Sequence, residues 1–297
     1  MTVCPVCGGA SDHALTARDR NRESTAATFE YDRCRACRTV FLADVPDDLS
    51  PFYTADYHVF DADGEPLWKR DGAPVGAAFR IGLLEHFVPP GHLIEIGAGA
   101  GAFATAALGA GFDVSAIEMD PQCCDYLTRA GASAICTDRP LDALAPLPLA
   151  RVVALWHVLE HLRGPIDVLA AAAAKLEPGG ILALAVPNPD SLQLRVLGAR
   201  WPHLDAPRHL SLIPAETLIA RGRELGLEPV ALTTSDPDGR DCDLHGWAYA
   251  LRRRPAEGQI APLPLHAAGV LTRALAPVER RGRRGAAFTL VLRKGPG

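Results

Sequence analysis

Apolar runs and amphipathic stretches alternate along most of the chain. Seven apolar runs predict strands, at 92–97, 113–117, 133–137, 151–156, 181–186, 228–234 and 287–292. Apolar or amphipathic stretches that stop at glycine or proline predict helices, at 77–87, 102–108 and 214–225. Strands that alternate with helices are typical of a sheet covered by helices on both faces. The pattern therefore predicts an α/β fold.

The alternating pattern occupies residues 76–297 and contains one interruption. Residues 235–285 separate the last two predicted strands, and they include an apolar stretch at 265–275 that predicts a further helix. We expect an insertion at 235–285. Whether it caps the substrate or forms a homodimer contact stays open.

Two segments precede this domain. Residues 1–45 contain two closely spaced cysteine pairs, and residues 46–75 are rich in proline, aspartate and aromatic residues. Tyr53, Tyr57 and Trp68 are expected to anchor the second segment on the following domain. It is then a connector or, alternatively, a lid over the pocket.

Composition narrows the class of protein. The chain has 297 residues, of which 48% are hydrophobic and 22% charged, with a net charge of −5. These are ordinary values for a globular protein, and they argue against a basic nucleic-acid-binding surface. No apolar run approaches the ~20 residues of a transmembrane helix. The N-terminus has neither a basic start nor an apolar export segment, which predicts a cytoplasmic protein without membrane contact.

The two cysteine pairs have the spacing of a zinc ribbon. Each pair is a CxxC motif, and together they comprise Cys4, Cys7, Cys34 and Cys37. Two intervening residues let both thiolates of a pair turn onto one ion, and four thiolates complete a closed tetrahedral shell. A disulfide framework would need an oxidising compartment, and a redox dithiol belongs at a helix start in a larger βαβ unit. We therefore predict a structural zinc ion.

A glycine-rich turn follows the first strand of the α/β domain. Gly97, Gly99 and Gly101 let the backbone approach a ligand, and Glu118 at the end of the next strand can accept both ribose hydroxyls. The same spacing also fits a dinucleotide fingerprint. Glu95 favours another ligand, because a carboxylate two residues before the first glycine would repel a pyrophosphate and would suit an ammonium group.

These residues resemble class I S-adenosylmethionine-dependent methyltransferases. The resemblance rests on Glu95-x-Gly97-x-Gly99-x-Gly101, on Glu118, and on the segments 157–162 and 176–181. It implies a Rossmann-like seven-stranded sheet with helices on both faces. The cysteine module in front further resembles bacterial methyltransferases of secondary metabolism and sugar modification.

The resemblance also assigns roles to residues. Glu95 and the backbone of Gly97, Gly99 and Gly101 would hold the methionine part of the cofactor. Glu118 would bind its ribose. The adenine and sulfonium groups would then be contacted by the remaining cofactor residues, namely Met119, Asp138, Trp156 and His157. For Asp138 a helix cap is an equal alternative.

The segment from His157 to His161 also matches the H-x-x-E-H zinc-peptidase signature. That chemistry needs a long helix, whereas this segment follows a strand and precedes Gly164-Pro165, so we set the peptidase aside. We expect Glu160 and His161 to form a buried hydrogen-bonded pair. Whether a general base or a second metal takes part in the transfer stays open.

The acceptor side is expected after the fifth strand, because open α/β sheets bind ligands at the carboxyl ends of their strands. His209, His157 and His161 are candidate catalytic residues, since a histidine can deprotonate an attacking O–H or N–H group. Arg208 could hold an anionic substrate group. The alternatives are that His209 caps the next helix and that Arg208 pairs with an acid.

The sequence thus predicts methyl transfer from S-adenosylmethionine to a small molecule, such as a natural-product intermediate or an activated sugar. Aminocarboxypropyl transfer from the same cofactor and an NAD-dependent oxidoreductase are the alternative enzymes. The identity of the acceptor and of the attacked atom is not readable from the residues.

Overall fold

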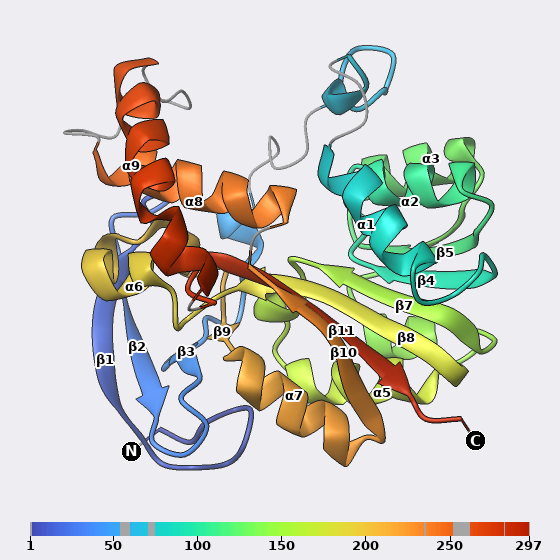
Figure 1. Ribbon diagram of the computed structural model, residues 1–297, viewed down its shortest axis with the longest axis horizontal. Coiled ribbons are helices and arrows are strands. Elements are labelled where there is room, and N and C mark those ends of the chain that lie inside the picture. The colour runs from blue at the N-terminus through green and yellow to red at the C-terminus, as the bar shows by residue number, and fades with distance from the viewer. Residues whose placement is uncertain are drawn as a thin grey trace.

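The computed structural model describes residues 2–53, 60–70, 75–234, 236–251, 262–281 and 283–296. A seven-stranded sheet forms its centre, with the strand order β10-β11-β8-β7-β4-β5-β6 (Figure 1). The five strands from β4 to β8 run parallel, and β11 and β10 are added antiparallel at one edge. The strands are β4 (His92–Ile96), β5 (Asp113–Glu118), β6 (Ser133–Cys136), β7 (Ala150–Trp156), β8 (Leu176–Pro187), β10 (Leu227–Thr233) and β11 (Ala287–Lys294).

This arrangement confirms the predicted α/β sheet and all seven of its strands. The largest difference is β8, which begins at Leu176, five residues before the predicted start at Ile181. The segment read as a turn instead continues the strand, with a register shift against β7 between Ala150 and Val152. Gly179 adopts a positive φ of 76° within this irregular stretch, which a β-carbon would disfavour.

Helices cover both faces of the sheet, and two apolar clusters fill the space beneath them. One cluster joins the sheet to α1, α2 and α3, and the other joins it to α4, α5 and α7. Figure 1 shows the first three helices together on one side and α5 and α7 on the other. Their bounds are α1 (Val75–Glu85), α2 (Ala102–Gly109), α3 (Pro121–Ala130), α4 (Pro140–Leu144), α5 (Pro165–Ala174) and α7 (Ala215–Glu224).

A second, four-stranded sheet contains the N-terminal segment. Its order is β1-β2-β3-β9, all antiparallel, with β1 (Ser11–Arg18), β2 (Thr28–Cys34), β3 (Val40–Leu42) and β9 (Ser211–Leu212). The last strand comes from far along the chain, since Val40 pairs with Leu212 and Phe41 with Ser211. The N-terminal segment is therefore joined to the acceptor-side segment by backbone hydrogen bonds.

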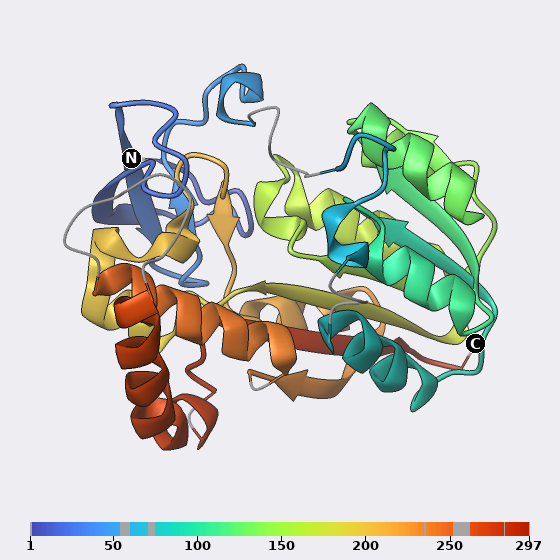
Figure 2. The ribbon, with the colours of Figure 1, turned by 90° about the horizontal axis from the view of Figure 1, so that it is seen from above.

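The insertion between β10 and β11 contributes two helices, α8 (Pro237–Ala250) and α9 (Pro262–Arg281). They pack on each other, and the indole N–H of Trp247 donates to the carboxylate of Glu279 at 3.0 Å. Figure 2 shows α8 running beside the sheet while α9 extends away from it. Within the described residues, no helix combines the length and apolar character needed to cross a bilayer.

Short elements connect these parts. They are α6 (Leu192–Leu197) and five single-turn 3-10 helices, η1 (Ser50–Phe52), η2 (Leu67–Lys69), η3 (Leu159–His161), η4 (Gly198–Arg200) and η5 (Pro202–Leu204). The turn η3 follows β7 directly, so it lies at the carboxyl edge of the parallel strands, where ligands bind in this class of fold.

Candidate active site

The loop between β4 and α2 has no room for side chains at two of its glycines. Gly97 and Gly101 have positive φ angles of 72° and 74°. A β-carbon at Gly97 would lie 2.4 Å from Val158 Cγ2, and one at Gly101 would lie 2.7 Å from the ring of Tyr126. The glycines therefore let the loop pack tightly against Val158, just before η3, and against Tyr126 of α3.

Glu118 ties this loop to the end of β5. Its carboxylate accepts backbone N–H bonds from Gly99 at 2.7 Å, from Met119 at 2.7 Å and from Asp120 at 3.0 Å. The side chain is buried, whereas Met119 beside it is 57% exposed. Asp138 is exposed at the end of β6. The structure thus brings Glu118 and Met119 to the loop and leaves Asp138 on the rim.

Among the residues that the structure describes, three buried polar atoms beside the glycine loop have no hydrogen-bond partner. They are Oε2 of Glu95, Nε1 of Trp156 and Nε of Arg80. The guanidinium of Arg80 lies 4.3 Å from the centroid of the Trp156 ring and pairs with Asp238 of α8 at 2.6 Å. Burial raises the pKa of Glu95 well above its usual value, nearby Arg80 opposes this shift, and Glu118 adds to it. This set of side chains fits a ligand that carries both a positively and a negatively charged group.

Arg80 was not among the predicted site residues, although the sequence carried a signal for it. Within α1, Gly76 and Leu84 are buried, and Arg80 lies four residues from each. Residues four apart share one face of a helix, so a charged residue stands on the buried face of α1. A cation in that position needs a partner inside the protein.

The connector contributes two anchors. The indole of Trp68 donates to the carbonyl of Ala100 in the glycine loop at 2.8 Å. The hydroxyl of Tyr53 lies 3.1 Å from Nδ1 of His161. Both residues therefore pack on the following domain as expected from the sequence, and the third expected anchor, Tyr57, lies outside the described residues.

Three histidines and one glutamate meet at the carboxyl end of β7. We call His157, Glu160, His161 and His209 the histidine cluster. Nδ1 of His157 lies 3.5 Å and Nε2 of His209 lies 4.0 Å from the Glu160 carboxylate, and the rings of His161 and His209 are 4.6 Å apart. His157 has a positive φ of 58°, a costly backbone geometry that concentrates at functional sites. Its side chain is 31% exposed, against 11% for His209 and 1% for Glu160.

Glu160 is buried as expected, but the expected hydrogen bond to His161 is not formed. Both carboxylate oxygens lack a hydrogen-bond partner among the described residues, while Nδ1 of His161 lies 3.1 Å from the carbonyl of Arg208. Burial raises the pKa of Glu160, but His157, His209 and His161 together lower it further, so the net shift is downward. Burial and His209 lower the pKa of His161 to about 4.

Arg208 is fully buried and does not face a substrate site. Its guanidinium donates to Asp19 at 2.8 Å and to Asp205 at 2.7 Å, and its side chain has no solvent exposure. The structure therefore matches the alternative in which Arg208 pairs with acids, and it gives no support to a contact with an anionic substrate. The neighbouring His203 is also engaged, with Nε2 2.9 Å from the carbonyl of Cys242.

The four N-terminal cysteines form a thiolate cluster, by which we mean Cys4, Cys7, Cys34 and Cys37. Their sulfurs all lie within 4.8 Å of one another, with 3.6 Å between Cys4 and Cys37 and 3.4 Å between Cys7 and Cys34. Zinc–sulfur bonds of about 2.3 Å in a tetrahedron place sulfurs about 3.8 Å apart. The sulfurs therefore fit one zinc ion.

The turns that shape the thiolate cluster are repeated in both knuckles. Gly8 and Arg38 each follow the second cysteine of a pair, have positive φ angles of 71° and 62°, and donate to the carbonyl of the first cysteine. The hydroxyl of Thr217 on α7 donates to the carbonyl of Cys37 at 2.8 Å. The cluster is thereby fastened to the helix layer below the sheet.

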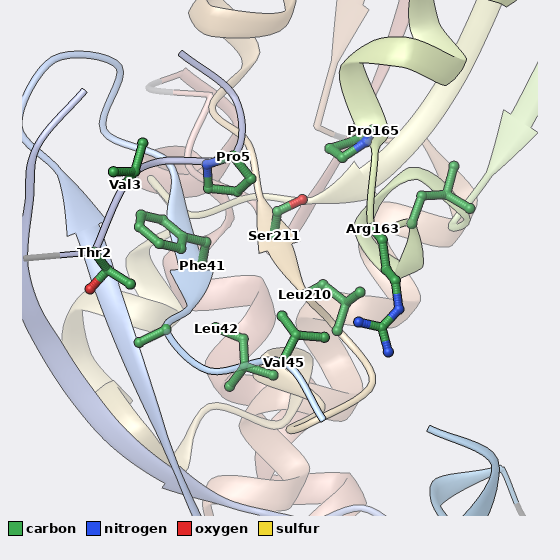
Figure 3. A pocket seen from close by; sticks show the side chains of 12 residues that line it. Thr2, Val3, Pro5, Phe41, Leu42, Val45, Arg163, Pro165, Leu210 and Ser211 are labelled. Atoms are coloured by element: carbon green, nitrogen blue, oxygen red, sulfur yellow. The ribbon is translucent and has the colours of Figure 1, made fainter. Parts of the chain in front are cut away.

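A pocket of about 260 Å³ lies between the N-terminal segment and the chain that follows η3, and Leu210 and Ser211 also line it. Figure 3 shows Val3 and Phe41 on one side and Arg163 and Pro165 on the other, with Leu210 between them. None of the predicted cofactor or catalytic residues lines it. It is therefore separate from the site built around the glycine loop.

The strand order, the glycine loop and the acid at the end of β5 define a class I S-adenosylmethionine-dependent methyltransferase. Comparison with known families agrees, because residues 77–232 match a family model described as a methyltransferase domain. The chain belongs to this methyltransferase family. The dinucleotide-dependent oxidoreductase considered from the glycine spacing is thereby superseded.

Individual relatives share 30% sequence identity or less with the chain in the examples that follow. The chain is 25% identical over 166 residues to a ubiquinone biosynthesis O-methyltransferase of Xanthomonas campestris pv. campestris, covering 51% of this chain and 70% of the relative. It is 30% identical over 156 residues to the protein of the same name from Thiobacillus denitrificans, covering 48% and 66%. A SAM-dependent methyltransferase structure from Archaeoglobus fulgidus superposes with a TM-score of 0.50 at 16% identity, over 74% of this chain and 93% of that one. At this identity the superposition speaks for the fold alone.

Proposed function

We propose that the protein methylates a small-molecule acceptor, such as a natural-product intermediate or an activated sugar. The observation that carries the proposal is the set of three buried atoms that have no hydrogen-bond partner among the described residues, on Glu95, Trp156 and Arg80, beside the glycine loop. Buried polar atoms normally have partners, so this set indicates a ligand with complementary groups. Relatives that are named for methylation of a ubiquinone precursor support a small acceptor.

In this proposal the cofactor's charges match those of the pocket. The Glu95 carboxylate binds the ammonium group, and Arg80 binds the carboxylate of the methionine part. Glu118 accepts the ribose hydroxyls with the lone pairs that its three backbone contacts leave free. Met119 lies against the adenine, and Asp138 on the rim reaches its amino group. Bound S-adenosylmethionine supplies an electrophilic methyl group on a sulfonium.

The histidine cluster faces the acceptor in the same proposal. His157 is the member that touches the acceptor, because its side chain is more exposed than those of Glu160 and His209 and it directly follows Trp156. Its imidazole can take the proton that an O–H or N–H acceptor loses, and the Glu160 carboxylate 3.5 Å away stabilises the resulting imidazolium. His161 and His209 complete the cluster around Glu160.

Zinc in the thiolate cluster has a structural role in this proposal, since a closed four-sulfur shell leaves no position for a substrate. The four cysteines form no disulfide bond. A reducing compartment keeps cysteines out of disulfides, which supports a cytoplasmic location. A homodimer contact through the insertion remains a prediction.

The test is product mass spectrometry with isotope-labelled cofactor and candidate acceptors from neighbouring reactions. A product heavier by one labelled methyl group supports the proposal, whereas gain of an aminocarboxypropyl group would replace it with that transfer. Glu118→Gln should weaken cofactor binding in calorimetry. Glu85→Gln is the matched control, because Glu85 is exposed at the far end of α1. Equal affinities of the two variants would refute the ribose assignment.

A further inference from the structure

Three side chains from two distant segments converge inside the histidine cluster. One ligand atom from each of Glu160, His161 and His209 lies within 4.8 Å of the others. The two segments are held together by the backbone, because the N–H of Leu210 donates to the carbonyl of Glu160 at 2.7 Å. The convergence is therefore built into the fold and does not depend on a flexible loop.

The backbone around both histidines determines which ring nitrogen is free. Nδ1 of His161 lies 3.1 Å from the carbonyl of Arg208, and Nδ1 of His209 lies 2.9 Å from the carbonyl of His203. A carbonyl only accepts hydrogen bonds, so Nδ1 carries the proton in both rings, and the Tyr53 hydroxyl, 3.1 Å from Nδ1 of His161, then serves as a second acceptor. In the neutral rings Nε2 then holds a lone pair. Metal-binding histidines show the same arrangement, with the second nitrogen donating to a carbonyl.

The glutamate completes a set of electron-pair donors. Both oxygens of Glu160 are buried without a hydrogen-bond partner among the described residues. Two nitrogen lone pairs and a carboxylate in one buried space require a cation or a proton between them. Two imidazoles and one carboxylate are a ligand set of divalent transition metals, whereas Mg²⁺ prefers oxygen ligands.

We propose that Glu160, His161 and His209 bind a divalent transition-metal ion such as Zn²⁺ or Mn²⁺. Three protein ligands leave at least one coordination position for water or for an acceptor oxygen. An ion there would acidify an acceptor hydroxyl bound to it beside His157. This catalytic consequence rests on the proposed function, but the metal site itself does not.

Cobalt substitution tests the site in the full-length protein. After metal removal and reloading with Co²⁺, the protein should take up two equivalents. Cobalt in the thiolate cluster should give an intense sulfur-to-cobalt charge-transfer band. Cobalt at the second site, which has no sulfur ligand, should add only weak visible bands. Excess Mg²⁺ should not displace the second equivalent. Glu160→Gln and His209→Gln should each lose that equivalent and keep the charge-transfer band.

The control is His245→Gln, because His245 is exposed on α8 and its Nδ1 lies 2.8 Å from the carbonyl of Asp241 in the same helix. It should keep both equivalents. Uptake of one equivalent by the wild-type protein, or of two by His209→Gln, would overturn the proposal. If both variants unfold, the wild-type spectrum alone decides. Measuring methyl transfer on the same samples separates the two proposals. Methyl transfer by a protein that binds no second metal ion refutes only the proposed metal site. Binding of a second metal ion without a methylated product refutes only the proposed function.

Discussion

Replacing Glu95 by glutamine should change cofactor affinity and protein stability in opposite directions. Glutamine keeps the shape of the side chain but removes the charge that we pair with the cofactor's ammonium group. Loss of one partner of a buried charge pair costs about 2–5 kcal/mol. Since each 1.4 kcal/mol is a factor of ten, the affinity should fall at least ~30-fold.

Stability of the cofactor-free protein should instead rise. Burial raises the pKa of Glu95 in the folded state, with Arg80 opposing and Glu118 adding to the shift. When the folded state raises the pKa of a carboxyl, the free energy of unfolding falls as the pH rises from the unfolded-state pKa to the folded-state pKa. Glu95→Gln avoids this loss. Its advantage should be absent below about pH 4 and should grow above it.

Isothermal calorimetry with S-adenosylhomocysteine and urea unfolding at acidic and neutral pH measure both effects. Glu85→Gln, the exposed control on α1, should change neither. Unchanged cofactor affinity of Glu95→Gln would refute the pairing with the ammonium group. A lower stability than wild type at neutral pH, without cofactor, would refute the assignment of Glu95 as an unpaired buried acid.

Other parts of the structure lead to further predictions. Arg208→Met should lower the free energy of unfolding by about 3–5 kcal/mol, because Asp19 and Asp205 lose their buried partner; an unchanged urea midpoint would contradict this. Gly97→Ala should cost about 1–3 kcal/mol and weaken cofactor binding, since its β-carbon meets Val158 at a positive φ. Thermal melts and calorimetry test it, and wild-type values would disprove the tight packing of the loop. Release of zinc from the thiolate cluster by a mercurial should accelerate hydrogen exchange in residues 2–45 and spare the central sheet; equal exchange in both states would show that the cluster holds no structural ion.

The strands of the central sheet could be predicted from sequence because each is a short apolar run between turn residues. The predicted strands at 113–117 and 151–156 differ from β5 and β7 by one residue. The early start of β8 was missed because Pro178, Gly179 and Gly180 have the composition of a turn. Pairing with β7 and β11 outweighs that local preference.

The joins between distant segments could not be predicted. The two residues of β9 carry no strand pattern of their own, and they become a strand only by pairing with β3. Likewise, Arg208 was a reasonable substrate ligand until the structure placed Asp19 beside it, 189 residues away in sequence. Local sequence patterns indicate which face of a helix or strand is buried and where turns occur. The partner of a buried charge depends instead on the tertiary fold.

The histidine cluster could be predicted only in part. The H-x-x-E-H segment and His209 were both singled out from sequence, but as separate candidates. Their meeting depends on the bond from Leu210 to the carbonyl of Glu160, which no spacing rule supplies. Arg80 could have been found, since its helical position relative to Gly76 and Leu84 places it on the buried face.

The pairing of β3 with β9 has a practical consequence for anyone who trims or recombines this protein. A shortened chain that begins at residue 46 would leave β9 with a bare edge and would strip Arg208 of Asp19. Chimaeras should therefore exchange residues 1–45 and 200–213 as one cassette.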